Sequence, residues 1–212
     1  MSDSFNQRRT EPPLPQIGDY FNSPSRYYNQ LDEKIIVNVH SGEYHVADSP
    51  EELMVTILGS CVAACVFDPF SKVAGMNHFL VPGNIMLDPS PRYGIFLMEY
   101  MINEVLKRGG IRSRLIVKIF GGASLMEGSS LEIGQQNIKF AQEYFANEGM
   151  EIAASDVGGN YARRIHFNAN NGKVMLRKLS RNEDFDRVIK EEKNYSENIS
   201  TTKNPGNIDL FK

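Results

Sequence analysis

The chain has 212 residues, of which 41 % are hydrophobic, enough apolar material for the core of one sizeable domain or two small ones. Its 23 Lys and Arg residues against 26 Asp and Glu residues give a net charge of −3, which argues against a nucleic acid as the main partner, because phosphate binding needs a basic surface. Two cysteines are too few for a disulfide framework, and Cys61 and Cys65 alone are a poor zinc site.

The N-terminal residues contain no apolar stretch of the kind found in secretory signals. The longest uncharged run, residues 53–67, has 15 residues and is too short to span a bilayer. We therefore expect a soluble cytoplasmic protein with reduced thiols.

Composition divides the chain into three parts. Residues 1–34 are polar, carry four prolines and show no regular period, so we interpret them as an N-terminal extension, either loose or held to the domain by Tyr27 and Tyr28. Residues 181–212 carry six basic and seven acidic residues, which predicts a short frayed helix near 183–193 followed by a flexible tail. Residues 35–180 remain as a single domain.

Within this domain, β-branched runs and turn signals predict nine strands. They cover residues 35–39, 43–47, 53–58, 61–67, 73–80, 114–120, 151–156, 163–168 and 173–179. The DPFSK sequence after residue 67 is typical of a hairpin turn, and Asn171-Gly172 is a strong hairpin signal between the last two strands.

Two helices are also predicted. The first begins after Ser90-Pro91, an N-cap followed by proline, and ends at Gly109-Gly110; the second covers residues 134–148 and ends at Gly149. Their expected apolar faces are Ile95, Met98, Ile102, Val105 and Leu106 in the first, and Ile138, Ala141, Tyr144 and Phe145 in the second. Because strands and helices do not alternate strictly, we expect an α/β (α+β) fold, a sandwich of mixed sheet with two main helices.

The sequence contains no G-x-G-x-x-G, Walker A, H-E-x-x-H or G-x-S-x-G motif. The pairs Gly121-Gly122 and Gly158-Gly159 each follow a predicted strand, which favours tight turns with positive φ over phosphate cradles. No metal or nucleotide cofactor is indicated.

The sequence Gly59-Ser60-Cys61 lies between two apolar strands, where a sharp turn can direct a sulfur into a cleft and aim backbone N–H groups at an oxyanion. Cys65 lies four residues further along the same strand, about 13 Å away, which is beyond disulfide reach. We interpret Cys61 as a candidate nucleophile and Cys65 as a packing residue. Simple burial is the competing interpretation for Cys61, since free cysteines are among the most buried residues.

A cysteine nucleophile needs a nearby base. In a hairpin centred near Phe70, paired residues sum to about 140, which places His78 opposite residue 62 and beside Cys61. Thr56, just upstream on the neighbouring strand, is the nearest hydroxyl that could orient the imidazole. The alternatives are a core histidine with satisfied hydrogen bonds and a threonine that merely favours a strand.

These residues resemble the signature of the CheD chemoreceptor glutamine deamidases. The resemblance is carried by residues 56–65, Asp68-Pro69 and Gly75-Met76-Asn77-His78-Phe79, and continues in Gly42-Glu43-Tyr44, Phe120-Gly121-Gly122-Ala123, Ile133-Gly134 with Asn137, and Asp156, Gly158-Gly159 and Arg163. It covers residues 37–179 and leaves the terminal extensions outside.

The resemblance implies an α/β sandwich akin to the deamidating necrotizing-factor toxins and hydrolysis of glutamine side chains of methyl-accepting chemoreceptors to glutamate. It implies a triad in which Cys61 is the nucleophile, His78 the base and Thr56 the residue that orients the histidine. Gly59 and Ser60 would support the oxyanion, and neither a metal nor another cofactor takes part. The spacing between the threonine and the cysteine varies by one residue in the family.

Two other classes of function remain open. One is a mainly non-catalytic chemotaxis adaptor that binds receptors and a CheC-type phosphatase, as the family resemblance implies. The other is another thiol acyl transfer, by a cysteine peptidase or a transglutaminase-like enzyme, which shares the triad logic. For docking on the receptor, the candidates for a basic patch are Arg163, Arg164, Arg177 and Lys178, which are otherwise simply a solvated face.

Overall fold

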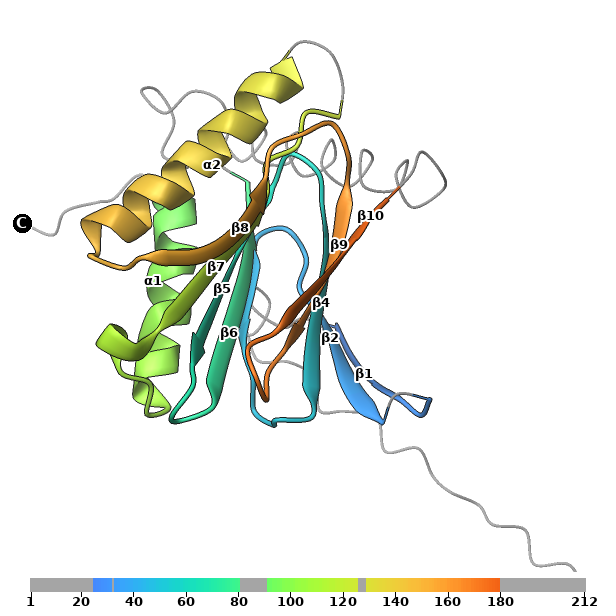
Figure 1. Ribbon diagram of the computed structural model, residues 1–212, viewed down its shortest axis with the longest axis vertical. Coiled ribbons are helices and arrows are strands. Elements are labelled where there is room, and N and C mark those ends of the chain that lie inside the picture. The colour runs from blue at the N-terminus through green and yellow to red at the C-terminus, as the bar shows by residue number, and fades with distance from the viewer. Residues whose placement is uncertain (1–24, 32, 81–90, 126–128, 180–212) are drawn as a thin grey trace, which may run out of the picture.

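A computed structural model of the chain describes residues 25–31, 33–80, 91–125 and 129–179. Those residues form two five-stranded sheets, two α-helices and a short 3₁₀ helix, η1, at Arg112–Arg114. Both helices lie against one sheet, and the other sheet packs on its opposite side (Figure 1). The expected α/β sandwich of mixed sheet with two main helices is confirmed.

The first sheet has the order β1-β2-β4-β9-β10 and the second β3-β6-β5-β7-β8. Each sheet is mixed: β2 and β4 are parallel in the first, and β7 and β8 in the second. The bounds in the first sheet are β1 Ser25–Asn29, β2 Lys34–Asn38, β4 Glu52–Leu58, β9 Arg163–Asn168 and β10 Val174–Lys178. In the second they are β3 Glu43–Val46, β5 Val62–Asp68, β6 Val73–Phe79, β7 Ile116–Gly121 and β8 Ile152–Val157.

Strand β5 is buried along its whole length because the second sheet is covered on both faces. Its odd-numbered residues, Ala63, Cys65 and Phe67, pack between the sheets with residues of β4 and β9. Its even-numbered residues, Val62, Ala64 and Val66, pack under the helices. The alternation of side chains along one central strand therefore builds two separate cores.

The predicted hairpins are confirmed. Strands β5 and β6 pair antiparallel, as do β9 and β10, and Gly172 has a φ of +66° in the second turn. The fourth predicted strand is shifted by one residue: β5 begins at Val62, and Cys61 lies in the bend before it.

The helices differ from the prediction in detail. Helix α1 spans Pro91–Lys107, and Ile95 is 41 % exposed, whereas Leu97 and Met101 are buried. Helix α2 spans Ser129–Asn147 and begins five residues before the predicted start. The prediction placed its first residue at Gly134, but a Cβ there would lie 2.6 Å from the carbonyl oxygen of Gly122. That glycine permits close approach inside the helix and does not mark its start.

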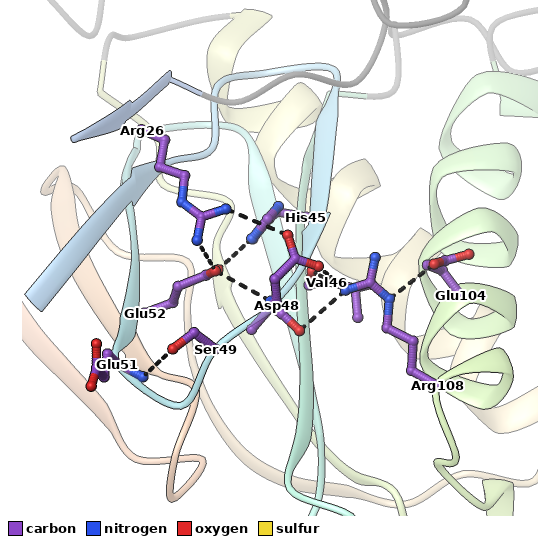
Figure 2. A network of polar contacts seen from close by, with 10 residues as sticks. Arg26, His45, Val46, Asp48, Ser49, Glu51, Glu52, Glu104 and Arg108 are labelled. Carbon is purple, nitrogen blue, oxygen red and sulfur yellow. Dashed lines mark hydrogen bonds and ion pairs between the residues drawn. The ribbon is translucent and has the colours of Figure 1, made fainter. Parts of the chain in front are cut away.

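The prediction that no strand precedes residue 35 is wrong for β1, which pairs antiparallel with β2. Arg26 on β1 binds the buried carboxylate of Glu52 at 2.7 Å. Figure 2 shows this contact continuing through His45 and Asp48 to Arg108, one residue past the end of α1, and from Arg108 to Glu104 within that helix. A polar network thus joins β1 to both sheets and to a helix. The N-terminal sequence shows no regular apolar period, so it does not reveal this network. The predicted division into extension, domain and tail stays a prediction, and residues 1–24 and 180–212 lie outside the described ranges.

Candidate active site

Cys61 lies where the chain crosses from β4 in the first sheet to β5 in the second. Its side chain is fully buried and belongs to the apolar cluster between the sheets. The expectation of a sulfur facing a cleft is therefore wrong for this structure, because the thiol follows the inward-facing side chains of β5. Ser60 is also buried, at 6 % exposure.

Three successive carbonyl groups hold this crossover in place. The oxygen of Gly59 accepts from the N–H of Ala123 at 2.6 Å, that of Ser60 from Asn137 Nδ2 at 3.0 Å, and that of Cys61 from the N–H of Gly122 at 2.7 Å. Because a hydrogen bond holds each of these carbonyl oxygens, the orientation of each peptide group in the turn is fixed. The turn thus depends on contacts from the end of β7 and from α2.

The two glycine pairs make these contacts possible. All four glycines have positive φ, which confirms the prediction of tight turns. A Cβ at Gly121 would lie 2.1 Å from the carbonyl oxygen of Cys61, so only glycine fits there. Gly158 donates its N–H to the carbonyl of Gly121 at 2.9 Å, and the second pair thereby supports the first.

His78 lies on β6 directly opposite Ala63 of β5. The paired residues sum to 141, so the predicted partner, residue 62, is off by one position. Cys61 precedes Ala63 by two residues and belongs to the same inter-sheet cluster, which makes it the diagonal neighbour of His78. The hairpin therefore brings the predicted cysteine and histidine to the same face.

Thr56 reaches His78 from the opposite sheet. Its hydroxyl oxygen lies 2.8 Å from Nδ1 of His78, and the backbone oxygen of Val39 lies 3.3 Å from the same nitrogen. The expectation that Thr56 acts from a neighbouring strand is corrected here: β4 belongs to the first sheet and β6 to the second. A carbonyl only accepts, so we assign the proton to Nδ1, which leaves a lone pair on Nε2.

The Nε2 atom of His78 is buried and has no hydrogen-bond partner among the described residues. Burial lowers the pKa of His78 from 6.5 to about 4, with a smaller effect in the same direction from His40 and an opposing effect from the Val39 carbonyl. The ring is therefore neutral near pH 7 and able to accept a proton.

Cys65 lies further along β5 and is almost completely buried. Burial raises the pKa of its thiol far above the ordinary value, even though Lys118 acts in the opposite direction. A thiol that stays protonated is a poor nucleophile. This environment fits the packing role expected for Cys65.

Sequence reasoning missed Ser41, in the loop between β2 and β3. Its hydroxyl oxygen lies 3.7 Å from the sulfur of Cys61. Twenty residues separate the two, and no spacing rule connects a loop serine to a strand-entry cysteine. Asn137 entered only as part of the family resemblance, and its contact with the Ser60 carbonyl is likewise a tertiary one.

The four basic candidates for a docking patch do not form one surface. Arg163 is fully buried and donates to the carbonyls of Gly121 and Gly158, both at 2.5 Å, so its assignment to a surface patch is wrong. Arg164 is half-buried, while Arg177 and Lys178 are exposed. Lys178 lies over the ring of Tyr161, with its Nζ 4.2 Å from the ring centroid.

Within the described ranges, no three His, Cys, Asp or Glu side chains are grouped as a metal site. No helix among those residues is long and apolar enough to cross a membrane. The expected lack of a cofactor stays a prediction.

Comparisons with known proteins identify the family. A family model described as CheD chemotactic sensory transduction matches residues 82–178. A Hahella chejuensis protein named probable chemoreceptor glutamine deamidase CheD is 42 % identical over 211 residues, covering 97 % of this chain and 98 % of that protein. A Rhodopseudomonas palustris protein of the same name is 41 % identical, covering 97 % of each. A Caulobacter vibrioides protein, also so named, is 45 % identical, covering 72 % of this chain and 83 % of its own.

Both of the longer alignments extend into the terminal segments, which the motif resemblance left outside. Among solved structures, a Neisseria meningitidis protein of the DUF152 family aligns over 59 % of this chain and 62 % of its own, at 7 % identity and a TM-score of 0.36, too low to support an argument. The Hahella chejuensis and Rhodopseudomonas palustris proteins, in contrast, match over nearly their whole length. This chain belongs to the CheD family.

Proposed function

We propose that this protein is a chemoreceptor glutamine deamidase, which hydrolyses selected glutamine side chains of methyl-accepting chemotaxis proteins to glutamate and releases ammonia. Relatives that match the chain over nearly its whole length carry this activity in their names. The single observation that carries the chemistry is the buried Nε2 of His78, without a hydrogen-bond partner among the described residues, on the inter-sheet face that also holds Cys61.

In the proposed mechanism, Nε2 of His78 takes the proton of the Cys61 thiol, and the thiolate attacks the carboxamide carbon of glutamine. N–H groups of the Gly59-Ser60-Cys61 turn stabilise the oxyanion. His78 then returns the proton to the amide nitrogen, and ammonia leaves with formation of a thioester. Water, deprotonated by the same nitrogen, hydrolyses the thioester to glutamate and restores the thiol.

Thr56 acts in this proposal as a positioning residue. By accepting from Nδ1–H, its hydroxyl holds the tautomer in which Nε2 is the base. The Val39 carbonyl is a second acceptor for the same proton. The imidazolium that forms during the reaction is stabilised by both oxygens.

Burial of Cys61 favours a side-chain amide over a backbone amide as substrate. A glutamine carboxamide projects from a receptor helix on a narrow chain and needs only a narrow opening to reach the sulfur. The peptide groups of a folded helix are hydrogen-bonded and covered by side chains. This difference ranks deamidation above the peptidase alternative.

The proposed substrate also indicates where the protein acts in the cell and which proteins it contacts. The modified glutamines belong to the cytoplasmic domains of chemoreceptors, so we place the protein in the cytoplasm. The adaptor role, with a CheC-type phosphatase as partner, is the second candidate. It predicts receptor binding without turnover, and no contact among the described residues favours it over deamidation.

The test is mass spectrometry of a purified chemoreceptor cytoplasmic domain after incubation with this protein, with ammonia release followed in parallel. Each conversion of glutamine to glutamate adds about 1 Da (replacement of NH₂ by OH). Cys61→Ala should abolish both signals, whereas Cys65→Ala, the matched control four residues further along the chain, should keep the wild-type rate within a few-fold.

Three outcomes would contradict the proposal. Retention of ammonia release by Cys61→Ala would exclude the thiolate mechanism. Receptor binding with no mass change in the wild-type reaction would favour the adaptor. Backbone fragments, or incorporation of an added amine, would identify a peptidase or a transglutaminase-like enzyme.

A further inference from the structure

Ser41 occupies a loop that is fixed to both sheets. The N–H of Val39 donates to the carbonyl of Val55 at 2.9 Å, and the N–H of Gly42 donates to the carbonyl of His78 at 2.7 Å. The same loop presents the Val39 carbonyl to Nδ1 of His78. The position of Ser41 is thereby tied to the backbone on which the histidine sits.

The Ser41 hydroxyl lies 3.7 Å from the Cys61 sulfur, within hydrogen-bonding distance for sulfur. In the thiol form either atom can donate. Once the thiol has lost its proton, the sulfur can only accept, and the serine O–H must donate to it. A hydrogen bond to a charged acceptor is stronger than one between neutral groups, so this contact stabilises the thiolate more than the thiol.

We propose that Ser41 is a further catalytic residue, whose hydroxyl donates to the Cys61 thiolate and favours its formation beside His78. Thr56 and Ser41 then act on different partners of the proton transfer. Thr56 fixes the base from β4, and Ser41 stabilises the conjugate base of the nucleophile from the β2–β3 loop. The catalytic meaning of this contact depends on the proposed deamidase function, whereas the effect on the thiol does not.

The test is a pH titration of the thiolate, followed by its absorbance near 240 nm as the difference between each protein and its Cys61→Ala counterpart. Removal of a hydrogen bond to a charged group should move the midpoint upward by about one to two pH units in Ser41→Ala. Ser41→Gly removes the same hydroxyl without adding bulk and should behave alike. Ser41→Thr keeps the hydroxyl and should titrate close to wild type.

Ser49→Ala is the matched control. Ser49 is also a loop serine, and its hydroxyl accepts from the N–H of Glu51 in the β3–β4 connection (Figure 2). Its removal should leave the titration and ammonia release unchanged. In Ser41→Ala, ammonia release below the wild-type midpoint should fall about tenfold for each pH unit of upward shift, with normal thermal unfolding.

An unchanged midpoint in Ser41→Ala and Ser41→Gly would overturn the role of Ser41. Failure to rescue by Ser41→Thr, with the variant folded, would also count against it. The titration requires no receptor, so it judges Ser41 separately from the proposed function. If Cys61→Ala still released ammonia, the proposed function would fail while the effect of Ser41 on the thiol could still be observed.

Discussion

Thr56 and His78 meet across the interior of the sandwich, with the threonine hydroxyl 2.8 Å from Nδ1 of the imidazole. Thr56 belongs to the sheet that contains β4, and His78 to the sheet that contains β6. The β5–β6 hairpin pairs His78 with Ala63, two residues after Cys61, but the hairpin alone does not orient the ring. The proposed base is therefore set by the packing of one sheet against the other.

Replacement of Thr56 by valine removes this hydroxyl and keeps the shape of the side chain. The Val39 carbonyl, 3.3 Å from Nδ1, remains as a weaker acceptor. We expect kcat/KM for ammonia release to fall about 10- to 100-fold, the equivalent of about 1.5 to 3 kcal/mol for a hydrogen bond to a charged group. Thr56→Ser should keep most of the activity. Equal activity of Thr56→Val and wild type would mean that the Val39 carbonyl alone orients the ring.

The buried imidazole makes stability depend on pH. Burial lowers the pKa of His78 to about 4 in the folded protein, whereas an unfolded histidine has a pKa near 6.5. Between these values the unfolded chain binds more protons, so the free energy of unfolding rises with pH from 4 to 6.5 and is unaffected by this group above 6.5. The full effect is about 3 kcal/mol.

Urea unfolding of wild type and His78→Gln at several pH values isolates this contribution, because glutamine does not titrate. The difference in the free energy of unfolding between the two proteins should grow with pH up to about 6.5 and then stay constant. If the difference in the free energy of unfolding stayed constant between pH 4 and 7, the pKa of His78 would be that of an unfolded histidine, and its surroundings would be hydrated.

The β5–β6 hairpin could be predicted from the sequence because the DPFSK turn joins two apolar runs and sets the centre of their pairing. The structure pairs His78 with Ala63 instead of the predicted residue 62, an error of one position. The position of Thr56 relative to the nucleophile could not be predicted in the same way. A contact between two sheets depends on how they pack, and no periodicity in one strand encodes it.

Other features could not be predicted from the sequence for related reasons. Arg163 follows a glycine pair and looks like a surface cation, yet its guanidinium is buried among backbone carbonyls. The loop serine Ser41 acquires its neighbour only in the folded chain. β1 lacks an apolar alternation because four of its five residues are exposed, and its place in the sheet is set by backbone pairing and the Arg26 contact with Glu52.

Gly121 allows a strict test of the backbone around the nucleophile. An alanine there would place a Cβ 2.1 Å from the Cys61 carbonyl oxygen, in a residue whose φ is +116°. We expect Gly121→Ala to lower the free energy of unfolding by about 3 kcal/mol or more and to remove activity, because the turn must move.

The matched control is Gly109→Ala. Gly109 has a φ of +95° but nothing within 4 Å of the added Cβ, so only backbone strain of about 1 kcal/mol is expected. Thermal or urea unfolding of both variants, with ammonia release measured where they are folded, separates strain from collision. Similar losses in the free energy of unfolding of the two variants would show that the Cys61 carbonyl can move away from the added Cβ without destabilising the fold.

Arg163 should behave as an internal brace and not as part of a docking patch. Its guanidinium donates to the carbonyls of Gly121, Asp156 and Gly158, and so holds the two glycine turns together. Arg163→Met keeps an unbranched apolar side chain but deprives buried carbonyls of their donor, which should lower the free energy of unfolding by about 3 kcal/mol or more. Arg177→Met, at an exposed site on β10, should change it by less than about 0.5 kcal/mol. If receptor binding weakened in Arg163→Met while the free energy of unfolding stayed normal, Arg163 would belong to the docking surface after all. We expect the free energy of unfolding to fall instead, because the crossover at Cys61 is held by Gly121 and Gly122.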